Sequence, residues 1–181
     1  MAYLVMSSRQ QHSRIHLASL FWPDRSEKDG RNNLRVALTR IGKHLSSEGK
    51  AYFCNQGQLV SINPEADVWT DAIRFTECIE FASKHKHVDL IDCIECCKAL
   101  DTAANLYQGS FMDGFYLEGC EEFEEWQLST REILHQQAVQ LLTELGNLNF
   151  LRHDYRTAEL HVRKCLHMEP LREDSHRMLM Q

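Results

Sequence analysis

The sequence predicts a mainly α-helical protein that contains one short β region. Only 8 of the 181 residues are Gly and 3 are Pro, so long uninterrupted helices can form. The composition is 43% hydrophobic and 25% charged, which is ordinary for a globular protein and excludes a disordered, collagen-like or coiled-coil chain. Residues 51–62, with the sequence AYFCNQGQLVSI, indicate two short strands around a turn at residues 55–58.

Two helices are expected before this hairpin, and residues 1–6 are apolar enough to be the remnant of another. Ser13 can cap a helix over Arg14–Phe21 that Pro23 ends, and a short loop then leads to a longer helix over Glu27–Leu45. A turn of 100° per residue places one apolar set on the core face of that longer helix, namely Leu34, Ala37, Leu38, Ile41 and Leu45. The order helix, loop, helix and hairpin predicts a winged helix-turn-helix, whose second helix enters the major groove of DNA.

The opposite face of the longer helix and the hairpin turn carry side chains suited to DNA. Asn and Arg can make bidentate contacts with base edges, a Val or Thr methyl can meet a thymine methyl, and basic or amide groups can reach phosphates. Lys50 is a further candidate near the backbone of the DNA. The candidate DNA-binding residues are Arg31, Asn32, Arg35, Val36, Thr39, Arg40, Lys43, Gln56 and Gln58.

The net charge of −6 is divided unevenly along the chain. Residues 1–63 contain nine Lys or Arg and four acids, a charge of +5, whereas residues 64–181 carry a charge of −11. This asymmetry fits a polyanion-binding head on an acidic body. Chance clustering of basic residues on a solvated face is the alternative that charge alone leaves open.

After residue 63 the expected elements are all helices, at about 71–83, 90–106, 118–147, 155–167 and 171–181. Leu142, Leu145, Gly146, Ala158 and Pro170 have the spacing of a tetratricopeptide repeat, in which small residues let two antiparallel helices pack closely. One repeat cannot bury its own apolar face, so we expect neighbouring helix pairs and a small right-handed solenoid. The predicted domains are therefore residues 1–63 and 64–181.

Several motifs in the same order along the chain resemble a known family. They are LASLFWPD at 17–24, RNNLR at 31–35, LYQGSF at 106–111, FEEW at 123–126 and EPLREDSHR at 169–177, together with Asp67, Phe75, Arg131, Glu132, Asp154 and Tyr155. This set resembles the SARP and AfsR-type transcriptional activators, which join an OmpR-like winged helix to a bacterial transcriptional activator domain. By this resemblance the chain is a partial winged helix-turn-helix followed by a tetratricopeptide-like α-helical repeat domain, truncated at both ends.

The resemblance implies a DNA-binding activator. The winged helix would recognise direct repeats in a promoter, and the helical domain would support a homodimer and contacts with RNA polymerase. The loop between the two helices of the helix-turn-helix would face the polymerase, which gives the candidates Trp22, Asp24, Arg25, Glu27 and Lys28. A helical interaction adaptor with a vestigial winged helix, and the front part of a larger regulator with a nucleotide-binding domain beyond Gln181, are the alternatives.

Cys93, Cys96 and Cys97 form a CxxCC cluster, with Cys78, His85 and His87 upstream. Thiolate and imidazole are zinc ligands, and Cys93 and Cys96 would share a helix face. Small buried cysteines are common in packed helices, however, and the seven cysteines lack a regular disulfide framework. We therefore expect reduced thiols, no metal site and no cofactor.

The sequence predicts binding and no catalysis. It contains no nucleophile elbow, HExxH motif or phosphate-binding Gly-rich loop, so no catalytic residue is proposed. His12, His16 and His44 could add charge near DNA at low pH, but scattered surface histidines are the better explanation. The acidic run that begins at Glu118 suits the start of a long helix, with Phe123 and Trp126 as core anchors. Without an apolar span or a signal peptide, we expect a cytoplasmic chain with no membrane partner.

Overall fold

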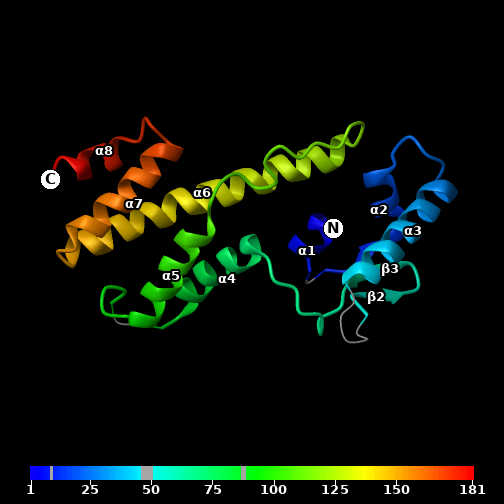
Figure 1. The fold of residues 1–181 in the computed structure, drawn as a ribbon, viewed down its shortest axis with the longest axis horizontal. Coiled ribbons are helices and arrows are strands. Elements are labelled where there is room, and N and C mark those ends of the chain that lie inside the picture. The colour runs from blue at the N-terminus through cyan, green and yellow to red at the C-terminus, as the bar shows by residue number, and fades with distance from the viewer. Residues whose placement is uncertain (9, 46–50, 87–88) are drawn as a thin grey trace. The chain divides into compact units, whose positions relative to one another are not determined.

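The computed structural model describes residues 1–8, 10–45, 51–86 and 89–181 and confirms a mainly α fold with one small sheet (Figure 1). The chain divides into two compact units. Unit 1 is Met1–Trp69 with Gly114–Leu128, and unit 2 is Thr70–Asp113 with Ser129–Gln181. Within the described ranges, no helix combines the length and the apolar character needed to cross a membrane.

Unit 1 begins with α1 (Ala2–Met6), β1 (His12–Ser13), α2 (Arg14–Phe21) and α3 (Glu27–Leu45). The hairpin of β2 (Phe53–Gln56) and β3 (Leu59–Ile62) follows, and the antiparallel sheet has the order β1-β3-β2. Both expected helices and the hairpin are present, whereas β1 was not expected. A strand of two residues is too short to show the alternating pattern that marks a strand in a sequence.

Local signals explain where these elements begin and turn. Ser13 caps α2 because its side chain accepts a hydrogen bond from the backbone N–H of Ile15. Gly57 has a φ of +60°, the left-handed conformation that the turn between β2 and β3 requires. The prediction that Leu45 belongs to the core is wrong, since this residue is 43% exposed. Leu45 is the last residue of α3, and helical periodicity does not reveal how far along a helix the covering partner extends.

The segment 114–128 completes the core of unit 1, although the sequence places it within the predicted domain 64–181. It contains the start of α6 (Glu121–Leu151), whose Phe123 is only 3% exposed, as expected for a core anchor. The ring centroids of Phe123 and Phe21 are 5.3 Å apart, and those of Trp126 and Tyr3 are 4.9 Å apart. These aromatic contacts join parts of the chain about a hundred residues apart, which a linear division of the sequence cannot reveal.

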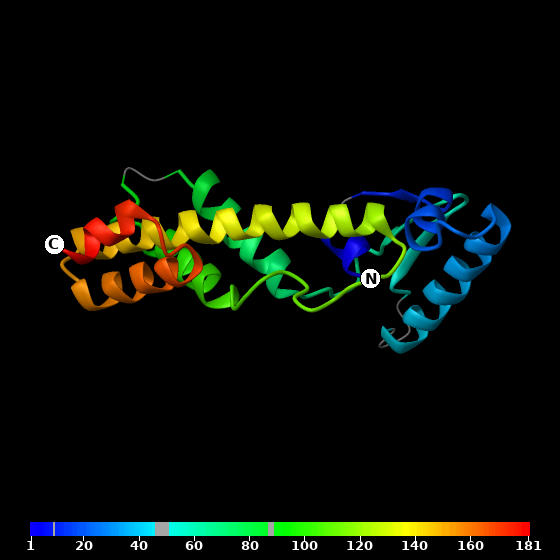
Figure 2. The ribbon, with the colours of Figure 1, turned by 90° about the horizontal axis from the view of Figure 1, so that it is seen from above.

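Unit 2 contains α4 (Asp71–Lys84), α5 (Ile94–Leu106), the remainder of α6, α7 (Tyr155–Met168) and α8 (Glu173–Leu179). In both views α7 runs alongside the C-terminal part of α6 (Figure 2). Gly146 of α6 makes this close approach possible, because a Cβ built there would lie 3.0 Å from Cγ2 of Val162 in α7. The predicted role of Gly146 in helix packing is therefore confirmed.

Candidate nucleic-acid interface

The candidate interface lies on α3, the helix that packs one face against α2. Gly30 is buried there, and a Cβ at this position would meet the Cβ of Ala18 at 3.4 Å. Leu34 and Leu38 are buried on the same side. The role of Gly30 was not predicted from the sequence, although a glycine inside a helical pattern is a recognised signal of close packing. With this face covered, the other side of α3 is left to solvent.

The exposed side of α3 carries most of the candidate DNA-binding residues. Asn32, Arg35, Thr39, Arg40 and Lys43 are exposed, whereas Val36 and Arg31 are half-buried. A helix that presents a polar and basic stripe of this kind has the side-chain chemistry for base edges and phosphates.

The first turn of α3 is fixed by local hydrogen bonds. Ser26 acts as the cap, since its Oγ accepts from the backbone N–H of Asp29 at 3.2 Å and donates to Oδ2 of Asp29 at 2.7 Å. Glu27 pairs with Arg31 at 3.5 Å, one helical turn later. Glu27 and Lys28, two of the candidates for polymerase contact, therefore lie on the helix and not in the loop that precedes it.

Arg31 connects α3 to the hairpin turn. Its Nη2 donates to Oε1 of Gln58 at 2.8 Å, so the structure brings together two predicted interface residues that lie 27 positions apart. Gln56, the last residue of β2 before this turn, accepts a hydrogen bond from Nε2 of Gln11 at 3.1 Å. Lys50, the other residue expected near the DNA backbone, lies outside the described residues.

Two further hydrogen bonds run along the exposed stripe of α3. Nη2 of Arg35 donates to Oδ1 of Asn32 at 3.0 Å, and Oγ1 of Thr39 donates to the backbone oxygen of Arg35 at 2.8 Å. These bonds hold the side chains against the helix. Contact with base edges would require Arg35 and Asn32 to exchange their mutual hydrogen bond for hydrogen bonds to a base. Such an exchange changes the free energy little, because one hydrogen bond replaces another.

Arg14 is a basic residue near the hairpin that the set of candidates omitted. Its guanidinium Nη2 donates to Oδ1 of Asn55, and its backbone N–H donates to the carbonyl oxygen of Gln58 at 2.8 Å. Its charge therefore adds to that of Arg31 near the turn. The sequence shows Arg14 only as one of several basic residues, and the pairing of β1 with β3 places it here.

The loop between α2 and α3 lies against the segment 114–128. Trp22 is half-buried, with its ring centroid 6.1 Å from that of Phe21, and Asp24 and Arg25 are exposed. The Cys120 thiol donates to the carbonyl oxygen of Phe21 at 3.6 Å. Burial raises the pKa of Cys120, and the nearby carboxylates of Glu124 and Asp24 raise it further. The Cys120 thiol is therefore neutral at pH 7.

The histidines of unit 1 differ in their surroundings. His12 is 7% exposed and its Nε2 lies 2.7 Å from Oγ of Ser7, so the preferred interpretation of His12 as a surface histidine is wrong. Burial lowers the pKa of His12 and keeps the ring neutral at pH 7. His16 lies between the hydroxyl of Tyr3, at 3.0 Å, and a carboxylate oxygen of Glu122, at 3.7 Å. Of the three candidates, only His44 is exposed.

The acidic segment changes the charge of the unit that carries α3. Unit 1 contains nine basic and eleven acidic residues, a net charge of −2, because residues 114–128 contribute five glutamates and no basic residue. The glutamates belong to a segment that contacts α1 and α2, as in the pair of Glu122 with His16. Any attraction of DNA therefore depends on the local charge of α3 and the hairpin and not on the charge of the whole unit.

Comparison with known families places the second part of the chain. Residues 70–181 match the family model described as the bacterial transcriptional activator domain. The chain belongs to this family. Among curated proteins no match was found. The match begins directly before α4 and continues through α8, so the bacterial transcriptional activator domain accounts for every helix of unit 2.

The bacterial transcriptional activator domain contains an open groove of about 460 Å³. Apolar side chains such as Ala104, Leu141 and Leu160 line it, and Arg163 and Lys164 stand beside them. Leu142 and Leu145, which the repeat spacing singled out, are buried in the same domain. The family assignment supports a role in transcription regulation, and a groove of this chemistry is suited to an apolar segment with acidic neighbours.

Proposed function

We propose that the chain is a DNA-binding transcriptional activator of the SARP type and that unit 1 is an OmpR-like winged helix-turn-helix. One observation carries this proposal: α2 covers one face of α3, and the opposite face of α3 exposes a polar, basic stripe. The hydrogen bond between Arg31 and Gln58 connects α3 to the hairpin. In this arrangement α3 enters the major groove, and the hairpin lies along the DNA backbone.

The candidate residues then divide by role. Asn32, Val36, Thr39 and Arg40 contact base edges or lie near them, with Arg35 on the flank of this set, whereas Lys43 at the end of the stripe neutralises a phosphate. Exposed residues of the loop and of the first turn of α3 meet RNA polymerase, and the bacterial transcriptional activator domain supports a homodimer. The proposed activity is binding to direct-repeat promoter DNA in the cytoplasm, without catalysis or a cofactor.

The test is fluorescence-anisotropy binding of the full chain to a pool of random DNA duplexes between about 50 and 200 mM salt, where counterion release changes affinity strongly. We expect steeply salt-dependent binding that the double variant Arg40→Glu with Lys43→Glu abolishes. The matched control is Lys98→Glu with Arg156→Glu, which reverses two exposed charges of unit 2 and has the same net charge. Equal loss in both double variants would contradict a role for α3.

A helical interaction adaptor is the second candidate, and two observations favour it. Unit 1 has a net charge of −2, and the bacterial transcriptional activator domain presents an apolar groove. An adaptor would bind no duplex at low salt even when circular dichroism shows a folded chain. That result would reject the DNA-binding proposal and direct attention to protein partners.

A further inference from the structure

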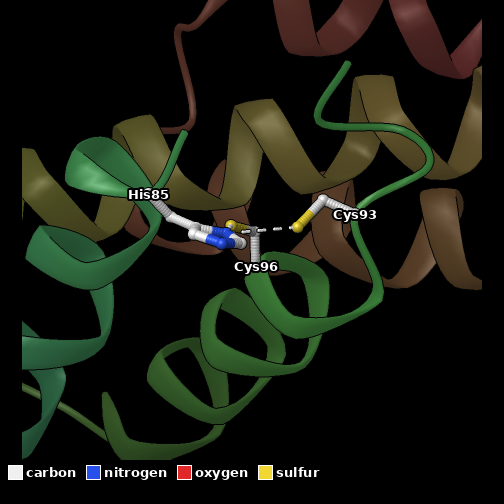
Figure 3. Close-up of side chains that lie close together, drawn as sticks. All are labelled: His85, Cys93 and Cys96. Carbon is white, nitrogen blue, oxygen red and sulfur yellow. Dashed lines mark hydrogen bonds between the residues drawn. The ribbon is translucent and has the colours of Figure 1, made fainter. Parts of the chain in front are cut away.

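Three potential metal ligands of unit 2 converge where α4 ends and α5 begins (Figure 3). His85 directly follows α4, Cys93 is the residue before the first turn of α5, and Cys96 lies in that turn. Nδ1 of His85 is 3.0 Å from Sγ of Cys96 and 3.4 Å from Sγ of Cys93. One ligand atom from each residue lies within 4.8 Å of the other two.

These separations are close to those of a zinc site. With Zn–S bonds near 2.3 Å and Zn–N bonds near 2.0 Å in a tetrahedron, a sulfur and a nitrogen ligand lie about 3.5 Å apart. The nitrogen–sulfur distance of 3.4 Å to Cys93 matches this value, and the distance of 3.0 Å to Cys96 is about half an ångström shorter, which side-chain rotation can accommodate. An ion among the three side chains would therefore require no rearrangement of the helices.

The His85 ring is oriented for such a role. It stacks on Phe81, with ring centroids 5.4 Å apart and an angle of 18° between the planes. While Nδ1 faces the two sulfurs, Nε2 lies 3.9 Å from a carboxylate oxygen of Glu95. Histidines that bind metal usually direct their second nitrogen to a carboxylate or carbonyl, which fixes the ring and its tautomer.

The neighbouring Cys97 is engaged elsewhere. Its Sγ accepts a hydrogen bond from Nη2 of Arg152 at 3.0 Å and donates to the backbone oxygen of Leu90 at 3.4 Å. The CxxCC motif thus divides into two cysteines that face His85 and one that faces other partners. Sequence alone favoured packing for all of them, because it could not show that the end of α4 brings His85 to this turn.

We infer that His85, Cys93 and Cys96 form a Zn²⁺ site, which binds the ion through Nδ1 and two thiolates and leaves a fourth position to water. On binding, each thiol releases its proton to solvent, and two thiolates with a neutral imidazole balance the charge of Zn²⁺. The ion would fasten the end of α4 to the start of α5 and so stabilise the first helix pair of unit 2. This inference does not rest on DNA binding.

The test uses the full chain, stripped of metal by a chelator and then titrated with Zn²⁺ or Co²⁺. We expect about one ion per chain, a thiolate-to-cobalt charge-transfer absorption with Co²⁺, and a higher melting temperature with Zn²⁺ than with chelator. A cobalt spectrum without thiolate bands, or a melting temperature that Zn²⁺ leaves unchanged, would overturn the site.

Cys93→Ser is the decisive variant because serine is a preferred residue at the start of a helix, so the fold should persist. We expect this variant to lose the cobalt band and the thermal response to Zn²⁺, and Glu95→Gln to bind Zn²⁺ about tenfold more weakly. Cys54→Ser, which removes a half-buried thiol of unit 1, should bind Zn²⁺ and Co²⁺ as the unchanged chain does. Metal binding by Cys93→Ser equal to that of Cys54→Ser would reject the proposal.

Discussion

At the scale of single residues, Gly42 of α3 and Gly146 of α6 face different surroundings. A Cβ at Gly146 in α6 would lie 3.0 Å from Cγ2 of Val162 and 3.3 Å from Sδ of Met178, whereas one at Gly42 in α3 would meet only the Phe53 ring, at 3.8 Å. Val162 is buried, and its β-branched side chain has little rotamer freedom with which to move aside. The same substitution should therefore have opposite effects at the two positions.

We expect Gly146→Ala to lower the free energy of unfolding by about 1 kcal/mol. The gain in helix propensity, about 1 kcal/mol, is outweighed by overpacking against α7, which costs roughly 1–3 kcal/mol. Gly42→Ala has the same gain without the clash and should raise stability by up to about 1 kcal/mol. Urea unfolding of both variants measures the difference. A stabilised Gly146→Ala would show that the contact between α6 and α7 has room to adjust.

Residues whose role is local could be assigned from the sequence, whereas residues whose role depends on distant partners could not. Ser13 could be assigned as a cap because a cap bonds to the backbone two or three residues later. The convergence of His85 on Cys93 and Cys96 depends instead on how α4 and α5 pack. Likewise, the burial of His12 follows from α1 and the sheet around it, about which its own position in the sequence says little.

At the scale of elements, the bounds of α2 and α3 follow from the sequence because strong signals surround them. Ser13 begins α2, Pro23 follows its end, and Ser26 with Asp29 opens α3. The starts of α5 and α6 were located less accurately, since α6 starts at Glu121 and not at Glu118, and α5 starts at Ile94 and not at Leu90. Acidic or apolar residues fit a helix and the turn before it equally, so composition leaves the first residue undetermined.

The start of α7 should make stability depend on pH. Oδ1 of Asp154 accepts a hydrogen bond from the backbone N–H of Thr157 at 3.2 Å, and hydrogen bonds to Thr157 lower the pKa of this carboxyl. Because the folded-state pKa is lowered, the cap stabilises the protein above the ordinary titration range of aspartate. This stabilisation is lost as the pH falls through the lowered folded-state pKa.

Two variants separate the hydrogen bond of this cap from its charge. Asp154→Ala should lower the melting temperature at pH 7 and have a smaller effect at an acid pH below the lowered folded-state pKa of Asp154, where the aspartate of the unchanged chain is protonated. Asp154→Asn keeps an oxygen acceptor, so it should retain most of the stability at pH 7 and lose the pH dependence due to this residue. Thermal unfolding at both pH values tests this. An Asp154→Ala variant with an equal effect at both pH values would contradict the role of the charged cap.

At the scale of the whole molecule, neither compact unit is a continuous stretch of the chain. Residues 114–128 belong to unit 1 and are flanked on both sides by residues of unit 2, so α6 contributes to both units. The periodicity of each helix could be recognised in the sequence, but contacts between residues about a hundred positions apart leave no periodic signal. The stability of α3 should therefore depend on a side chain far from it in the sequence.

Phe123→Ala tests this dependence. Phe123 is 3% exposed and packs against Phe21 in the helix that supports α3, so its truncation should destabilise unit 1 by roughly 3–5 kcal/mol. We expect faster amide hydrogen exchange in α3, which measures local and global opening. Leu128→Ala is the control, since Leu128 lies in the same segment and is 60% exposed, and it should leave this exchange nearly unchanged. Unaltered protection of α3 in Phe123→Ala would show that the segment 114–128 covers unit 1 without stabilising it. In that case residues 1–69 would hold their fold through their own core.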